Sequence, residues 1–295
     1  MQSNQAEKLY LQACAYLEQG MYEQAIISYN EALQINPDFY EARLDLANLL
    51  LETDQHTSAI NQYKILIKEK SNNYYFYFCL GYCYHQINSL EESILAYRKA
   101  AELQNSNPDI HFNLGIVYSD MKLFDNAIRE YLLAIGLNPN YTEAYDNLGV
   151  IYTNKNENDL AKNMFETAIQ INDAYPLSHY NYACLLKNEG NFKEALEHFF
   201  KALNDGYDTP EIHFHIGDCY LDLGVTNKAI HSLGKALKMN TSNPLVHYKL
   251  GVAFSEMGLY SEAVAHLKTY LRINPDSPEM EEINLILSSL QDALY

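Results

Sequence analysis

Histidine and cysteine side chains are the residues of this chain best suited to metal binding or nucleophilic chemistry. The chain holds ten histidines and five cysteines. His179, His213 and His247 follow one another at equal intervals, a spacing that indicates a repeated packing position rather than a local cluster. His213 and His215 are two residues apart, and side chains at that spacing point to different sides of a helix. The histidines therefore predict no metal site.

The cysteines and the turn motifs do not assemble into a recognisable active site either. The five cysteines form no CxxC pair, and Cys79 and Cys83, four residues apart, are expected to be reduced thiols in a core. Residues 154–159 resemble the start of a calcium loop but lack its glycine, and Phe165 stands where the loop needs Glu. The chain has no glycine-rich phosphate loop and no GxSxG. We expect no catalytic residues, no cofactor and no enzymatic activity.

Charge and hydropathy limit the kinds of partner that the chain is expected to bind. Of the 295 residues, 38 are acidic and 20 basic, a formal net charge of −18. Such a surface repels phosphate, so we expect no nucleic-acid binding. No run of eighteen apolar residues exists, so no membrane insertion is expected. The unpaired cysteines and the absence of a signal-peptide pattern at the N-terminus favour the cytoplasm.

The sequence is dominated by one repeated unit. Rows of equal length align eight times from Ala6 to Ser277 without an insertion or deletion. Positions 8, 20 and 27 of the rows are Gly or Ala except at Ser93, Leu66 and Tyr270, whereas positions 11 and 24 hold large aromatic or leucine side chains. Small residues at fixed places allow two helix backbones to approach closely. The large and small positions therefore predict closely packed helix pairs.

Each row reads as a helix, a tight turn and a second helix. Apolar positions 4, 7, 8 and 11 follow helical spacing, as do positions 20, 24 and 27. Between them, position 15 is Gly, Asn or Asp in seven rows and Lys122 in the other, which indicates a left-handed residue ending a helix. All eight prolines stand at position 32 or position 1, where a helix has stopped or is starting.

This pattern resembles the tetratricopeptide repeat (TPR) family, whose unit of about 34 residues carries small side chains at positions 8, 20 and 27. The resemblance implies an all-α fold, a superhelix (α-solenoid) of eight helix-turn-helix repeats whose first helices line a concave groove. Local departures are Arg43 at position 4, Ser93 at position 20, and Leu66 and Tyr270 at position 27. The expected organisation is a short tail at 1–5, an array at 6–277 and a capping helix at 278–295, with repeats at 6–39, 40–73, 74–107, 108–141, 142–175, 176–209, 210–243 and 244–277.

The two ends of such an array need polar surfaces, because every repeat otherwise stacks on a neighbour. The segment 278–295 supplies an amphipathic helix, with its apolar stripe at Ile283, Ile286, Leu287, Leu290 and Leu294 and acids at Glu279, Glu281, Glu282 and Asp292. Only five residues precede the first repeat, so its first helix is expected to expose one side, through which the chain could form a homo-oligomer.

In the family, positions 2, 5, 6, 9, 12 and 13 of each repeat face the groove. Among the residues at these positions, thirteen are acidic and only Lys187 and Lys249 are basic. Position 5 is aromatic in six rows, and position 6 is Asn in three consecutive rows. The candidate groove residues are Tyr10, Asp45, Asn48, Phe78, Tyr82, Phe112, Asn113, Asp146, Asn147, Tyr180, Asn181, Phe214, Asp218, Asp222 and Tyr248.

Each groove feature has two interpretations. The aromatic rings could hold aliphatic, Arg or Lys side chains of a ligand, or they could lean onto neighbouring repeats as core. The acids could attract a basic ligand or simply keep the array in solution. Asn113, Asn147 and Asn181 are similar to the asparagine ladder of O-linked N-acetylglucosamine transferases, in which amides bind peptide backbone. The Lys and Asn set that clamps chaperone C-termini in another subgroup is missing from every three consecutive rows.

The sequence therefore predicts a non-catalytic scaffold or adaptor for protein–protein interaction, which binds a peptide segment of a partner in an acidic groove with aromatic side chains. The partner segment would be basic or aromatic, and its binding should weaken with salt. Two alternatives remain: a regulatory subunit that presents substrates to a separate enzyme, of a glycosyltransferase or secretion system, and a self-associating structural scaffold.

Overall fold

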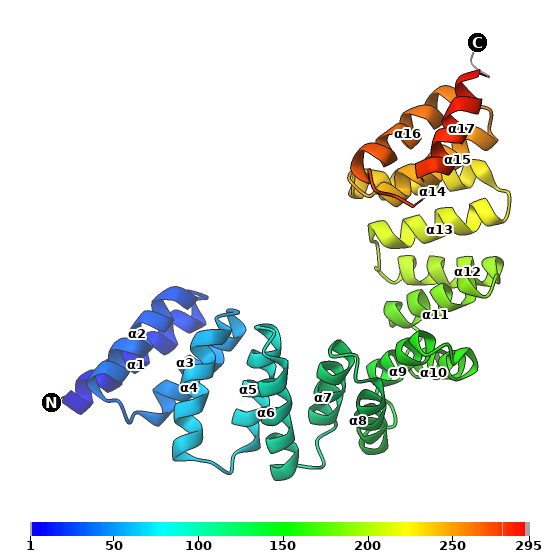
Figure 1. The fold of residues 1–295 in the computed structure, drawn as a ribbon. Helices are drawn as coiled ribbons and strands as arrows, with labels where there is room; N and C mark the ends of the chain where they lie inside the picture. The colour runs from blue at the N-terminus through cyan, green and yellow to red at the C-terminus, as the bar shows by residue number, and fades with distance from the viewer. Residues whose placement is uncertain (1, 279, 293–295) are drawn as a thin grey trace. The chain divides into compact units, whose positions relative to one another are not determined.

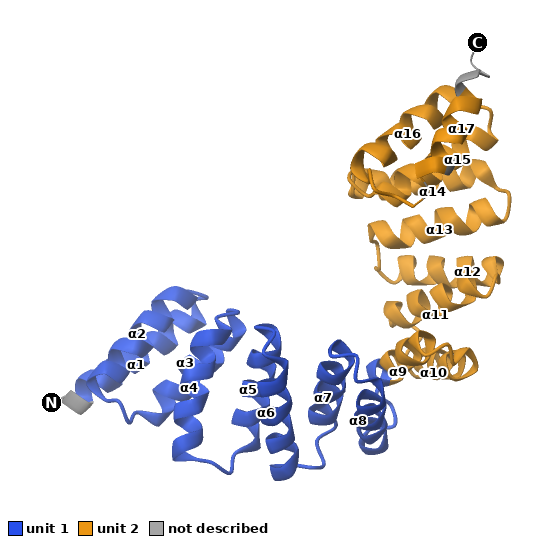
Figure 2. Cartoon of the chain, in the orientation of Figure 1, with its two compact units in different colours: residues 1–144 blue, residues 145–295 orange. Residues whose placement is uncertain are grey.

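The computed structural model describes residues 2–278 and 280–292, which form seventeen α-helices and no strand. The helices follow one another in pairs joined by short turns (Figure 1). The chain divides into two compact units, residues 1–144 and 145–295 (Figure 2). The helices of the first unit are α1 (Gln2–Glu18), α2 (Tyr22–Ile35), α3 (Tyr40–Glu52), α4 (His56–Glu69), α5 (Tyr74–Gln86), α6 (Leu90–Leu103), α7 (Pro108–Asp120) and α8 (Phe124–Leu137).

The second unit continues the same pattern. Its first helix, α9, begins within the last residues of the first unit. The helices are α9 (Thr142–Asn154), α10 (Asn158–Ile171), α11 (Pro176–Asn188), α12 (Phe192–Asn204), α13 (Pro210–Asp222), α14 (Thr226–Met239), α15 (Pro244–Glu256), α16 (Tyr260–Ile273) and α17 (Met280–Asp292). In rows two to eight the first helix begins at the first residue of the row. In the first row, helix α1 reaches back to Gln2 because no Gly or Pro interrupts residues 2–5.

The turn inside every repeat depends on one left-handed residue. All eight residues at position 15 have positive φ, between 56° at Asp54 and 81° at Gly190. Lys122, which lacks the usual turn chemistry, has a φ of 59° and ends its helix in the same way. The predicted helix-turn-helix pattern is confirmed in all eight rows.

The two helices of a repeat meet where a small residue faces a large ring. A Cβ atom added to Gly149 would lie 2.4 Å from a ring carbon of Phe165, and one added to Gly115 would lie 2.6 Å from the ring of Tyr131. The residues at position 24 are fully or almost fully buried. Glycine at position 8 is therefore a requirement of packing in these repeats.

Within each unit, positions 3, 7 and 10 of the first helices are the buried positions toward the neighbouring repeat. Every residue at these positions in rows two to eight is buried, and nearly all are apolar. In the first row the same positions hold Lys8, Gln12 and Ala15, which are exposed. The N-terminal repeat thus carries polar or small side chains where its neighbours carry their stacking residues.

Helix α17 covers the last repeat. Ile283, Leu287 and Leu290 are buried in a cluster with Leu267 and Tyr270 of α16, and Ile286 packs against that cluster. Of the acids predicted to face outward, Glu281 is exposed. Leu294 and Glu279 lie outside the described residues, as do the side chains of Glu282 and Asp292.

The four residues that depart from the repeat pattern are all buried. Ser93 is fully buried and its hydroxyl donates to the carbonyl of Gly81 at 2.7 Å. Arg43 donates to Oε1 of Gln62 at 2.8 Å. Leu66 is fully buried, and the hydroxyl of Tyr270 lies 2.8 Å from that of Ser277. Each of the polar substitutes therefore makes at least one hydrogen bond, although Nε of Arg43 is buried without a partner.

Several of the histidines and cysteines occupy packing positions. His179 and His213 are buried, and His215 stacks on the ring of Phe199 with centroids 5.7 Å apart. Among the described residues, no three His, Cys, Asp or Glu side chains are placed to share a metal ion. Cys79 and Cys83 are buried free thiols, and burial raises the pKa of Cys83 to about 12. Within the described part of the chain, no helix has the length and apolar character needed to cross a membrane.

The contact at position 8 predicts a stability change. Gly149→Ala should destabilise the protein by about 1–3 kcal/mol, because the new methyl group overlaps the Phe165 ring. Gly234→Ala is the matched control in a helix of the same unit, since its added methyl meets no atom within 4 Å and should stabilise α14 by about 0.5–1 kcal/mol. Urea unfolding followed by circular dichroism measures both, and a Gly149→Ala variant as stable as wild type would contradict this packing.

The burial of His215 predicts that the stability of the protein depends on pH. Burial, and then the charge of Lys187, lower the pKa of His215 from 6.5 to about 4. Folding therefore favours the neutral ring. The stability that the neutral ring contributes is complete above the pKa of the unfolded state and is lost as the pH falls below 6.5. Between pH 7 and pH 5 wild type should lose about 2 kcal/mol more stability than His215→Leu, which cannot titrate. Equal losses in the two proteins during urea unfolding would show that His215 is not the cause.

Candidate peptide-binding face

The groove positions of the first helices, which are positions 2, 5, 6, 9, 12 and 13, form what we call the first-helix face. In the first unit it comprises these positions of α1, α3, α5 and α7 together with Glu143 of α9, and in the second unit the remaining ones of α9 and those of α11, α13 and α15. Side-chain bonds connect successive helices on this face. In the first unit the hydroxyl of Tyr10 donates to Asp45 at 2.9 Å, and Nε2 of His85 lies 2.6 Å from a carboxylate oxygen of Asp120. The predicted residues thus lie on adjoining helices.

The aromatic side chains at position 5 are half-buried and pack against the core. Phe112 lies 5.8 Å from the ring of Tyr131 and stacks on Tyr141 at 4.7 Å. Tyr180 lies 5.9 Å from Phe199. Other position-5 contacts are Tyr10 with Tyr29, Phe78 with Tyr97 and Tyr248 with Tyr270, while Phe214 packs against the cluster that contains Leu233. One side of each ring therefore belongs to the core, and only the remainder is open to a ligand.

Two amides of the asparagine ladder are engaged within the chain. The amide of Asn113 donates to the carbonyl of Asp109 at 2.8 Å, and that of Asn181 donates to Oδ2 of Asp146 at 2.9 Å. Asn147 is half-buried like both of them, and it too has an interaction within the chain. Each of these bonds uses one donor hydrogen of the amide, so a peptide that required both hydrogens of Asn113 or Asn181 would have to displace it.

Two further candidate residues are Asn48 on α3 and Tyr82 on α5. The side-chain oxygen of Asn48 accepts from the hydroxyls of Tyr63 at 2.9 Å and Tyr75 at 3.3 Å, so it links α3 to the next two helices. Tyr82 is 36% exposed, with its ring edge-on to His56. Tyr82 is thus the more accessible of the two.

Asp218 holds three first helices together. Its carboxylate lies 2.9 Å from Nζ of Lys187 on α11 and 2.5 Å from Nζ of Lys249 on α15, and only 7% of the residue is exposed. Burial opposes ionisation, but the two ion pairs outweigh it and lower the pKa of Asp218. Asp218 uses both basic side chains of the face, so its charge is neutralised. Asp146 is also buried, whereas Asp222 is exposed.

The net charge of the face differs between the units. In the first unit these positions carry no Lys or Arg, and in the second unit both lysines contact Asp218. The acids of the first unit are Glu7, Glu18, Glu41, Asp45, Glu52, Asp109 and Asp120, together with Glu143 at the start of α9. Those of the second are Asp146, Glu211, Asp218, Asp222 and Glu256. Uncompensated negative charge is therefore concentrated on the first unit.

Similar proteins share this architecture. The Cut9–Hcn1 hetero-tetramer of the APC/C has 17% identity and a TM-score of 0.66, and the similarity covers 96% of this chain and 55% of that one. Pseudomonas aeruginosa pilF has 20% identity and a TM-score of 0.65 over 71% of this chain and 95% of its own. YrrB, described as a TPR protein with an unusual peptide-binding site, has 22% identity and a TM-score of 0.56 over 66% and 98%.

A curated protein and several family profiles also match. The general transcriptional corepressor trfA of Dictyostelium discoideum is 27% identical over 95 residues, which is 32% of this chain and 7% of that protein. The chain thus spans a small part of this relative and about half of the matched chain of the Cut9–Hcn1 structure. Profiles described as tetratricopeptide repeat match residues 16–78, 108–141, 142–175, 177–204 and 246–277, and one described as TPR repeat matches 84–122 and 217–258. The chain belongs to the tetratricopeptide repeat family.

Proposed function

We propose that this chain is a non-catalytic adaptor that binds a basic segment of a partner protein on the first-helix face of its first unit. Tandem TPR units form extended surfaces for protein–protein interaction, and the fold indicates that role here. The observation that carries the specific proposal is the set of eight acidic residues, with no Lys or Arg, at the groove positions of this unit. A surface of one sign raises the local concentration of oppositely charged ligands.

The positions of three of these acids strengthen the argument. Glu18, Glu52 and Asp120 are the last residues of α1, α3 and α7, and none of these helices has a basic residue in its last turn. The C-terminal end of a helix carries partial negative charge, so a carboxylate there is unfavourable by itself. A Lys or Arg side chain of a ligand would contact both the carboxylate and the helix end.

Aromatic side chains supply the apolar part of the surface. Tyr82 is 36% exposed, and the rings of Phe78 and Phe112 are half-buried. Rings beside carboxylates suit the aliphatic stems and charged heads of Lys and Arg. The peptide-binding site reported for YrrB is a precedent for peptide recognition by this fold.

The two alternative functions have less support. The substrate-presenting subunit depended on the asparagine ladder, in which Asn113 and Asn181 already bond within the chain. Self-association through the N-terminal repeat would use a surface that carries Lys8 and Gln12 at stacking positions. We place the adaptor in the cytoplasm because all five cysteines are free.

Charge reversal tests the preference for the first unit. Glu18→Lys with Glu52→Lys should weaken binding of a fluorescein-labelled peptide of alternating Lys and Tyr by about tenfold, since each lost pair contributes about 0.5–1 kcal/mol. It should also flatten the salt dependence of binding. Fluorescence anisotropy measures both effects.

Asp222→Lys with Glu256→Lys is the matched control, because these exposed acids stand at the same repeat position in the second unit. This control should change the affinity less than twofold. Equal losses in the two double variants would reject a preference for the first unit, and no loss in either would reject the acidic face as the binding site.

A further inference from the structure

The outer side of several repeats is closed by a contact between position 4 of the first helix and position 23 of the second. Four repeats place a polar pair there with side-chain atoms 2.8 or 2.9 Å apart. The pairs are Arg43 with Gln62, His111 with Glu130, His179 with His198, and His247 with His266. A long side chain at position 23 thus fills the space between the helices of its repeat.

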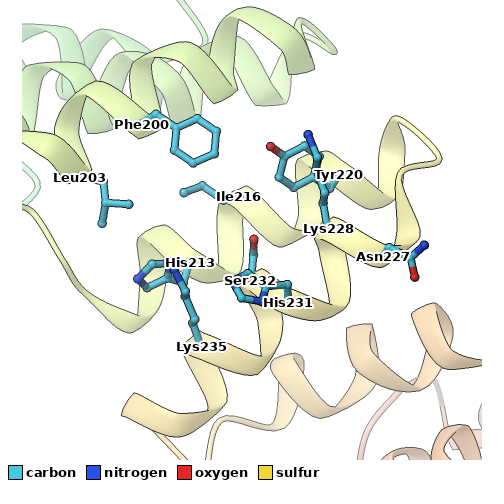
Figure 3. A pocket seen from close by; sticks show the side chains of 10 residues that line it. All are labelled: Phe200, Leu203, His213, Ile216, Tyr220, Asn227, Lys228, His231, Ser232 and Lys235. Carbon is cyan, nitrogen blue, oxygen red and sulfur yellow. The ribbon is translucent and has the colours of Figure 1, made fainter.

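The seventh repeat has no long side chain at position 23. Position 23 is Ser232, and His213 at position 4 instead bonds through Nε2 to Asp208 at 2.7 Å. A cavity of about 420 Å³ opens beside Ser232, between α12, α13 and α14 (Figure 3). The third repeat, where position 23 is Ala96, has a smaller cavity of about 250 Å³ at the same place. In both repeats a small residue at position 23 borders the cavity.

Apolar and aromatic side chains from two helices form part of the wall of the larger cavity. Ile216 and Tyr220 of α13 line it together with Leu203 and Phe200 of α12 (Figure 3). Phe200 is 39% exposed although its ring borders the cavity. A second hollow shares Leu203, His213 and Lys235 with it and adds Met239, which is 48% exposed. The two hollows therefore adjoin each other through three shared residues, and each has apolar side chains beside polar ones.

The rim of the cavity is basic in a strongly acidic protein. Helix α14 carries three lysines and no acidic residue. Lys228 and Lys235 line the cavity, with Nζ of Lys228 5.3 Å from the ring centroid of Tyr220, and Lys238 lines the adjoining hollow. Asp208 is the one acid among the residues that line the two hollows, and it is bonded to His213. The rim therefore has a charge opposite to that of the first-helix face.

We propose that this cavity is a second docking site, which binds an acidic segment of a partner protein that inserts an apolar side chain between α12, α13 and α14. The volume lies within the range of about 300–1,000 Å³ typical of ligand sites. The apolar part of the wall would hold a Leu or Phe side chain of the segment, and the lysines of α14 would pair with its carboxylates. This site extends the adaptor role, since one chain could hold a basic and an acidic segment on different faces.

The test uses two labelled synthetic peptides and anisotropy measurements on the full chain. One is a run of Glu and Asp around a central Leu-Phe pair, and the other has Ser in place of that pair. We expect wild type to bind the Leu-Phe peptide at least tenfold more tightly than the Ser peptide. Equal binding of the two peptides would overturn the proposal, because it would leave only nonspecific charge attraction.

Two variants locate the site. Ser232→His introduces the ring that the sixth and eighth repeats carry at this position, and should close the cavity and lower affinity for the Leu-Phe peptide about tenfold. Lys228→Glu with Lys235→Glu changes only exposed side chains and should have a similar effect through charge. Lys268→Glu, an exposed lysine of α16, is the control and should change affinity less than twofold.

Circular dichroism checks that each variant is folded. If Ser232→His does not fold, the double lysine variant alone tests the site. Undiminished binding by the double lysine variant, or an equal loss with Lys268→Glu, would overturn the site. The basic peptide that tests the first-helix face should bind these variants as it binds wild type, so the two docking sites can fail independently.

Discussion

The close approach of two helices inside each repeat is the constraint on which the rest of the structure depends. At position 8 of five repeats a glycine leaves space for the ring or leucine at position 24, and a single added carbon would overlap that side chain. Because the helices are in contact there, positions 3, 7 and 10 present a continuous apolar surface to the neighbouring repeat. Stacking then accounts for the stability that a single pair could not reach alone.

The same constraint separates structural from exposed residues on the first-helix face. Side chains at position 5 lean onto the ring at position 24 of their own repeat, so they are partly core. Asp146 and Asp218 are buried and bonded to neighbouring helices, so their carboxylates help to hold those helices together. The carboxylates of Glu18 and Glu52 at the helix ends are exposed instead, which leaves them accessible to a ligand.

Position 23 of the second helix varies from repeat to repeat, whereas position 8 is always Gly or Ala. Position 23 can be Gln, Glu, His, Met, Ala or Ser without disturbing the contact at position 8. In four repeats a long polar residue there pairs with position 4, and in the third and seventh repeats a small one leaves a cavity. A solenoid can therefore change its outer surface one repeat at a time, without altering how its helices stack.

The sequence by itself determined the repeat length, the two helices of each unit, the left-handed turn residue and the apolar stripe of α17, because these follow from local propensity and a period repeated eight times. The stacking positions 3 and 10 are also apolar in most rows, as at Ala42, Phe76 and Ile110, but the helical spacing of positions 4, 7, 8 and 11 does not include them. Only the tertiary structure decided which charges are compensated. Lys187, Asp218 and Lys249 are far apart in the sequence, and their ion pairs exist because stacking brings three helices together. The cavity beside Ser232 is likewise a property of neighbouring helices, since a small side chain leaves space only where nothing else fills it.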